Sequence, residues 1–176
     1  IELREIALLN DYLRPALIAR LVHKPTSTGF FLIANHFSRG GAGDEYRRHA
    51  QAYMLNNWIL DHRDMPIIAA GDFNFDYDLN DPEHNRDRGF DLLRLDYKGD
   101  PVVHWIRPGT LVNTQCSWDR RKKKCRYNSI LDFIFVNNKA NNWEWESRVV
   151  VREKDFPDNK RTSDHRPVEG VFRIVP

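Results

Sequence analysis

The stretch Pro66-Ile67-Ile68-Ala69-Ala70-Gly71-Asp72-Phe73-Asn74 decides the fold of this 176-residue chain. Its short apolar run, residues 67–70, is typical of a strand buried on both faces. Gly71 then lets the backbone bend or approach another group closely. Asp72 and Asn74 follow two residues apart, so both point to one side of the sheet if strand geometry continues. A carboxylate beside an amide suits a divalent metal or a phosphate oxygen. The alternative is an ordinary turn, because Gly, Asp and Asn are common turn residues.

Length and composition predict a single domain over residues 1–176. The chain is 41% hydrophobic and 30% charged, which fits a globular protein with a core rather than a disordered one. The net charge of +2 is too small to indicate any partner. No apolar run reaches transmembrane length, and no secretory signal pattern opens the chain. Composition alone therefore leaves the substrate class open.

Apolar runs bounded by turn residues predict the strands of a sheet. These runs cover residues 4–10, 16–23, 30–36, 67–70, 129–137, 148–152 and 168–175. A helix is predicted from Asp44, a suitable N-cap, to about residue 64, and a shorter one over 89–97. Five residues recur at helical spacing in the long helix and are interpreted as core packing: Tyr46, Ala50, Tyr53, Met54 and Trp58. The acidic segment 74–88 is predicted to be a long solvated loop.

Polar residues stand at the ends of several of these strands. The sites are Arg14, Asn35-His36, Asp72 with Asn74, Asp132 within the apolar run 130–136, and Asp164-His165. Each alone has a structural explanation, for example a buried partner of an arginine or a hydrogen-bonded core histidine. Together, two histidines, three acids and two asparagines at strand ends favour a concave functional site.

The ordered motifs Asn35-His36, Gly71-Asp72-Phe73-Asn74, Leu131-Asp132-Phe133 and Ser163-Asp164-His165-Arg166-Pro167 resemble the endonuclease/exonuclease/phosphatase superfamily. That superfamily includes deoxyribonuclease I, abasic endonucleases, neutral sphingomyelinases and inositol polyphosphate 5-phosphatases. The segment after Asn35-His36 is most similar to bacterial extracellular nucleases, for which a secreted or periplasmic location is expected. The resemblance implies a deoxyribonuclease I-like α/β sandwich of mostly antiparallel sheets flanked by helices.

The resemblance also implies a site for phosphodiester hydrolysis that depends on Mg²⁺ or Mn²⁺. Its catalytic residues are His36, Asp72, Asn74, Asp132 and His165. Asp72, Asn74 and Asp164 are the implied metal ligands, and Arg14 and Asn35 the implied phosphate contacts. In this scheme Asp164 holds His165, and Asp132 supports a histidine tautomer.

The N-terminal part of the family's fold has no counterpart in this sequence. The family carries an asparagine on its first strand and a metal-binding glutamate on a later one, and neither Glu2 nor Glu5 matches that pattern. We therefore expect the N-terminal portion to be missing. An apolar sheet face would then meet a separate segment or a dimer partner. Strand residues Phe31, Ile33, Ile68 and Ala70 are expected to line that face.

Two further features leave alternatives open. Cys116 and Cys125 either form a disulfide across a short loop, which implies an oxidising compartment, or are two free thiols. Between them lies a basic cluster, residues 120–126, flanked by Trp118 and Tyr127. It either follows a nucleic-acid backbone or is a solvated hairpin tip. The expected activity is that of a nuclease acting on DNA or RNA. The alternatives are a phospholipid or small phosphoester hydrolase, and an inactive member that only binds.

Overall fold

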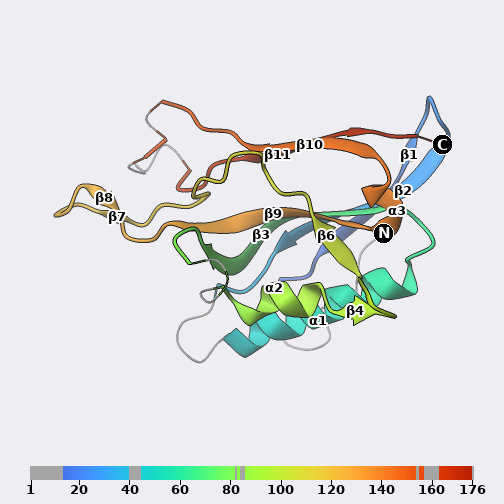
Figure 1. The fold of residues 1–176 in the computed structure, drawn as a ribbon, viewed down its shortest axis with the longest axis horizontal. Helices are drawn as coiled ribbons and strands as arrows, with labels where there is room; N and C mark the ends of the chain where they lie inside the picture. The colour runs from blue at the N-terminus through green and yellow to red at the C-terminus, as the bar shows by residue number, and fades with distance from the viewer. Residues whose placement is uncertain are drawn as a thin grey trace.

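A five-stranded sheet forms the centre of the computed structural model, which describes residues 14–39, 45–81, 83, 86–153, 155–156 and 163–175 (Figure 1). The strand order is β1-β2-β3-β9-β6, with β2 and β3 parallel and the other neighbours antiparallel. The strands are β1 (Leu17–His23), β2 (Thr28–His36), β3 (Ile67–Asp78), β6 (Val103–Trp105) and β9 (Ser129–Asn137). The predicted strand at 4–10 and the N-cap Asp44 lie outside the described residues.

Helices cover one face of this sheet and a two-stranded sheet covers the other. Helices α1 (Glu45–Asp61) and α2 (Arg88–Leu93) lie below the sheet in Figure 1, while β10 (Glu144–Val149) and β11 (Val168–Arg173) lie above it. Small elements complete the fold: β4 (Asp96–Tyr97), β5 (Asp100–Pro101), β7 (Trp118–Asp119), β8 (Lys124–Cys125) and α3 (Asn138–Asn141). This is the predicted α/β sandwich with mostly antiparallel sheets.

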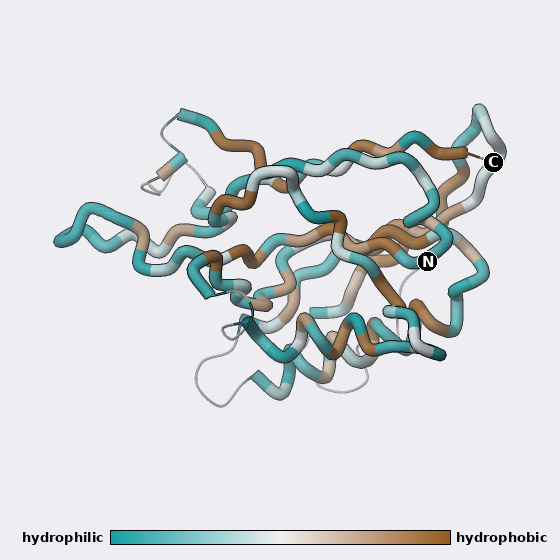
Figure 2. Tube along the Cα trace, viewed as in Figure 1, coloured by the Kyte–Doolittle hydropathy of each residue, from teal (hydrophilic) through white to brown (hydrophobic). Residues whose placement is uncertain are grey.

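The apolar run of β3 is buried on both faces, as its sequence predicts. Ile67 and Ala69 belong to a core shared with α1 and α2, whereas Ile68 packs with Ile134 and Trp143 on the opposite face. The brown segments of Figure 2 follow this arrangement through the middle of the molecule. Strand β3 nevertheless continues to Asp78, so the predicted loop is shorter than the sequence analysis had it.

The buried face of α1 is not the one that the apolar spacing predicts. Tyr46 and Tyr53 are 58% and 50% exposed. Met54 and Trp58 are partly buried against the core. The residues that α1 buries are Arg48, Gln51, Ala52, Leu55, Asn56 and Ile59. Three of these are polar, and their buried side chains bond backbone carbonyls and amides of neighbouring segments instead of water.

Three of the four residues expected to line an exposed apolar face, Phe31, Ile33 and Ile68, are buried. Phe31 and Ile33 point to the helical side of the sheet and are buried there, and Ile68 is covered by Trp143 and its neighbours. On β1 and β2 the exposed apolar side chains include Leu17, Leu21 and Leu32. Leu17 and Leu32 are next to buried positions, as strand alternation requires, whereas Leu21 lies between the exposed residues Arg20 and Val22.

Candidate active site

Three predicted site residues lie in a row across the central sheet. In the strand register His36 of β2 is the partner of Asp72 of β3, and Asp72 is the partner of Asp132 of β9. Paired residues on neighbouring strands project from the same face, so these side chains stand next to one another. The His36 Nε2 and Asp72 Oδ2 atoms are 3.6 Å apart. Sequence segments almost 100 residues apart thus meet at one end of the sheet.

Beyond Asp72 the backbone of β3 leaves regular strand geometry. Asn74 and Asp76 have positive φ angles of 53° and 45°, a conformation that Asn and Asp tolerate better than most residues. The register with β9 shifts between Asp72 and Tyr77. Asn74 is fixed by two hydrogen bonds: its backbone N–H donates to Asp72 Oδ1 (2.9 Å), and its Nδ2 donates to the Phe37 carbonyl (3.0 Å). The irregularity therefore holds Asp72 and Asn74 at the same opening.

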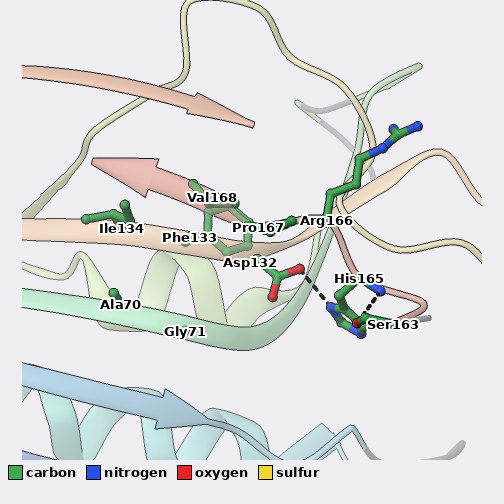
Figure 3. A pocket seen from close by; sticks show the side chains of 10 residues that line it. All are labelled: Ala70, Gly71, Asp132, Phe133, Ile134, Ser163, His165, Arg166, Pro167 and Val168. Atoms are coloured by element: carbon green, nitrogen blue, oxygen red, sulfur yellow. Dashed lines mark hydrogen bonds and ion pairs between the residues drawn. The ribbon is translucent and has the colours of Figure 1, made fainter. Parts of the chain in front are cut away.

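His165 reaches this row from the segment before β11. Its Nδ1 donates to Asp132 Oδ2 at 2.9 Å. Figure 3 shows Asp132 directed from β9 at the His165 ring, while Arg166 points away. Asp164 does not hold the ring, which corrects the expectation from sequence: its carboxylate accepts from Gln115 Nε2 (3.3 Å). Asp164 therefore lines the same cleft as His165 without bonding its ring.

The local environment shifts the pKa values of two of these groups. Burial raises the pKa of Asp72, and the negative charge of Asp132 adds to this effect, while His165 opposes it. The hydrogen bond to Asp132 raises the pKa of His165, partly against the effect of burial. A carboxyl and an imidazole with perturbed pKa values side by side are typical of a site that moves protons.

The row opens into a cleft of about 440 Å³. Its lining residues are Arg14, His36, Ser38, Arg39, Asp72, Asn74, Leu131, Asp164 and His165. Most of the predicted site residues are thus brought together. Arg14 is exposed, and its guanidinium lies against the His36 ring. Asp132 lies behind His165 and lines a second hollow of about 280 Å³ (Figure 3).

Asn35 is the predicted site residue that the structure places elsewhere. It is 7% exposed and absent from the cleft lining, because strand alternation turns it to the opposite face from His36. Its Oδ1 and Nδ2 atoms are buried and have no hydrogen-bond partner among the described residues. Its proposed contact with a phosphate would require the side chain to turn through the sheet.

Two buried side chains that the sequence analysis did not identify support the site. Gln51 of α1 accepts from the Ser38 N–H (2.8 Å) and donates to the Arg14 carbonyl (3.1 Å), joining two parts of the cleft wall. Thr114 Oγ1 accepts from the backbone N–H of Leu131 (2.9 Å) and of Asp132 (3.2 Å). The sequence pattern indicates neither role, since Gln51 is a polar residue of a helix and Thr114 lies in an irregular segment.

Gln51→Ala is expected to lower the free energy of unfolding by about 1–3 kcal/mol, because it leaves two backbone groups of the cleft wall without partners. The measurement is urea denaturation followed by circular dichroism. Asn57→Ala, at an exposed position of the same helix, is the matched control and should change stability by less than about 0.5 kcal/mol. Equal effects of the two substitutions would contradict the supporting role of Gln51.

Asp132→Asn is expected to lower the pKa of His165, because the carboxylate that stabilises the imidazolium is removed. Since the folded pKa is raised above its ordinary value of about 6.5, the stabilisation is complete below that value and is lost as pH rises through the folded pKa. The variant should therefore lose more stability at pH 5 than at pH 9. Proton NMR titration of the metal-free protein measures the pKa directly. An equal His165 pKa in the variant and the parent would contradict the role given to Asp132.

The cleft offers oxygen donors of the kind that Mg²⁺ and Mn²⁺ bind. Asp72, Asn74 and Asp164 contribute carboxylate and amide oxygens to its lining. In the part of the chain that the structure describes, no three His, Cys, Asp or Glu side chains are grouped closely enough to hold an ion by themselves. Mg²⁺ is commonly held by one or two carboxylates, with water and substrate phosphate completing the shell. The residues present fit such a partial site.

A histidine oriented by a partly buried carboxylate, beside an acid and a second histidine in an open cleft, is typical of the active site of a hydrolase. The sequence matches the model of the Endonuclease/Exonuclease/phosphatase family over residues 4–165. The chain belongs to this family, whose members are hydrolytic phosphoesterases and typically depend on a divalent metal. No curated protein matches the sequence.

Solved structures show the same fold at low sequence identity. The mannosyl-6-phosphatase Bt3783 of Bacteroides thetaiotaomicron is 18% identical, with a TM-score of 0.62; the match covers 90% of this chain and 57% of that one. A humanized D. rerio TDP2 is 19% identical (TM-score 0.59, 91% and 61%). The human Nocturnin catalytic domain is 18% identical (TM-score 0.54, 90% and 52%). The chain thus spans less than two thirds of each of these proteins.

Proposed function

We propose that this chain is a metal-dependent phosphodiesterase that hydrolyses nucleic acid. The observation that carries the proposal is the His165–Asp132 pair next to Asp72 and His36 in one cleft. Hydrolysis of a phosphodiester needs an activated water, stabilisation of charge on the phosphoryl oxygens and a proton for the leaving oxygen. The described side chains supply a candidate for each requirement.

His165 acts on the attacking water in this proposal. Its Nδ1 is engaged by Asp132, so the opposite nitrogen, Nε2, is the one available to take a proton from water or to donate to the phosphoryl group. The carboxylate fixes the orientation of the ring and stabilises the imidazolium once it forms. Asp132 is thus a positioning residue rather than a group that contacts substrate.

The remaining residues bind the phosphate and assist the leaving group. His36, half-exposed at the cleft, is placed to give a proton to the leaving oxygen, and Arg14 beside it offers a positive charge to the phosphate. Asp72 orients the attacking water, and Asn74 donates the remaining hydrogen of its Nδ2 group to a phosphoryl oxygen. A divalent metal held by Asp72 and Asp164 would supply further stabilisation of negative charge.

Chelation is expected to abolish activity, because the cleft holds several acids that would repel a phosphate unless a cation offsets them. The assay compares plasmid DNA, RNA, bis-p-nitrophenyl phosphate and sphingomyelin, with Mg²⁺ or Mn²⁺ and after exhaustive EDTA treatment. Hydrolysis that is unchanged by chelation would refute the metal. Cleavage of sphingomyelin without cleavage of nucleic acid would favour the lipid alternative, and no hydrolysis of any substrate would favour a binding protein.

The disulfide supports a location in an oxidising compartment. Cys116 and Cys125, the only cysteines of the chain, are bonded to each other. Such bonds persist mainly in secreted and periplasmic proteins, and we propose that location here. No helix in the described ranges has both the length and the apolar character needed to cross a membrane. Thiol labelling of the protein from its native host would test the proposal, since free cysteines would contradict it.

A further inference from the structure

The β7–β8 hairpin carries a concentration of positive charge that the catalytic site does not use. Its residues 118–126, here called the basic hairpin, include six Lys or Arg and a single acid, Asp119. In Figure 1 the hairpin projects beyond the end of the central sheet, and Figure 2 shows its tip as strongly hydrophilic. Residues 120–124, which form the tip, are all basic and exposed.

The net positive charge of the chain comes from this hairpin. The chain has 27 Lys and Arg against 25 Asp and Glu. Without the basic hairpin, 21 basic residues would remain against 24 acidic ones. The rest of the protein is thus slightly acidic, and the cleft itself contains three aspartates in or behind its wall. A polyanion would be attracted to the hairpin far more than to the molecule as a whole.

The hairpin is held in one shape by several bonds. The Cys116–Cys125 disulfide closes its base, and Arg126 N–H donates to the Ser117 carbonyl (2.9 Å). At the tip the Asp119 carboxylate accepts from the backbone N–H of Arg121 (2.9 Å) and of Lys122 (3.1 Å). An ordered array of cations loses less entropy on binding than a flexible loop does. The cations are therefore presented as a preformed surface.

The base of the hairpin is attached directly to the segment that carries His165. Cys116 N–H donates to the Asp164 carbonyl (3.1 Å), and Gln115 pairs with His165 as an isolated β-bridge. Arg166 N–H donates to the Thr114 carbonyl (2.7 Å). A polymer bound along the hairpin would therefore be held in a fixed relation to the cleft.

We propose that the basic hairpin binds the phosphate backbone of nucleic acid outside the cleft, so that it selects polymeric over small phosphodiester substrates. This inference rests on the proposed nuclease function. Lys and Arg contact phosphates without regard to sequence, and each contact releases counterions from the nucleic acid. Tyr127, 57% exposed just beyond the hairpin, offers a surface on which an unpaired base can stack.

A lipid surface fits the hairpin less well than nucleic acid does. Stable binding to a membrane generally needs an apolar insertion or acyl chain in addition to basic residues. The tip offers none, because its five residues are all Lys or Arg. Nearby Trp118 is half-buried at the base. Phosphate recognition needs only the cations that are present.

The test compares R120Q/R121Q/K122Q with the parent chain. Lys123 is left unchanged because its φ of 48° makes substitution there a backbone change as well. The Asp119 turn is preserved, since it uses backbone N–H groups. Fluorescence anisotropy with a labelled duplex in EDTA measures affinity without cleavage. We expect the affinity to fall at least tenfold at about 0.1 M salt, and the slope of log K against log salt to become shallower by about 1–3.

R20Q/K24Q/K139Q removes the same charge from exposed positions outside the hairpin and the cleft lining, and should leave the slope unchanged. The rate of bis-p-nitrophenyl phosphate hydrolysis should be equal in all three proteins, because the hairpin contributes to binding of the polymer and not to cleavage of the bond. Equal losses of affinity in both triple variants would overturn the proposal. The proposal would also be overturned if the hairpin variant kept its affinity for the duplex but no longer bound phosphatidylserine vesicles. That result would show that the hairpin binds anionic lipid. If the parent chain hydrolyses no phosphodiester, the proposed function is wrong. The binding comparison would still show whether the hairpin binds nucleic acid.

Discussion

His165→Ala is expected to lower kcat for phosphodiester hydrolysis by ~10²–10³-fold, because it removes the group best placed to act on water and on the charge of the phosphoryl oxygens. The loss should appear with plasmid DNA and with bis-p-nitrophenyl phosphate alike, since the residue acts at the scissile bond. KM should change far less than kcat. Steady-state kinetics on both substrates at saturating Mg²⁺ measures the effect.

His104→Ala is the matched control. His104 lies on β6, which pairs with the opposite end of β9 from Asp132, and it is not part of the cleft lining. It should retain the parent kcat. Circular dichroism and thermal unfolding of both variants would establish that each remains folded. A His165→Ala protein that is folded and active within a few-fold of the parent would refute the assignment of this site.

Gly71→Ala is expected to destabilise the protein by about 3–5 kcal/mol, through backbone strain and overpacking together. Gly71 has a φ of 138°, and a Cβ atom built there would lie 2.0 Å from the Asn35 carbonyl oxygen. The parallel strands β2 and β3 meet at this point, one residue before His36 and Asp72. Urea denaturation would measure the loss against a typical total stability of about 5–15 kcal/mol.

Substitutions at two other glycines distinguish the effect of backbone strain from the effect of overpacking. Gly109 has no neighbour within 4 Å of its built Cβ and no positive φ, so Gly109→Ala should be close to neutral. Gly99 has a φ of 92° but open space around it, so Gly99→Ala should cost only the backbone strain, about 1–2 kcal/mol. If Gly71→Ala were no worse than Gly99→Ala, the close contact with Asn35 would not be needed for the fold.

The sequence predicts the strands well where one local rule decides the outcome. The apolar runs at 67–70 and 129–137 form buried strands, because continuous apolar segments of this length are removed from water on both faces of a sheet. The strand predicted over residues 30–36 corresponds to β2, and its end at His36 is as expected. The clustering of His36, Asp72, Asn74 and His165 was predictable from their positions at strand ends and from their resemblance to a known order of motifs.

The failures concern the direction of side chains. The buried face of α1 was predicted from the spacing of its apolar residues. Arg48, Gln51 and Asn56 are buried instead, because backbone groups of neighbouring segments need hydrogen-bond partners. Helical periodicity contains no information about those segments. The partner of His165 was predicted from its neighbour in sequence. It is Asp132 instead, the acid that was expected to support an unspecified histidine, and the approach of β9 in three dimensions identifies that histidine as His165.

The order of the site residues along the chain also has a consequence during synthesis. His36, Asp72 and Asp132 leave the ribosome before His165, and the segment with His165 pairs with Gln115 and Asp132, which must already be in place. A nascent polypeptide that has not yet exposed this segment contains every strand of the central sheet but lacks its proposed water-activating histidine. The proposed phosphodiesterase would therefore be inactive until this segment has left the ribosome and docked on the sheet.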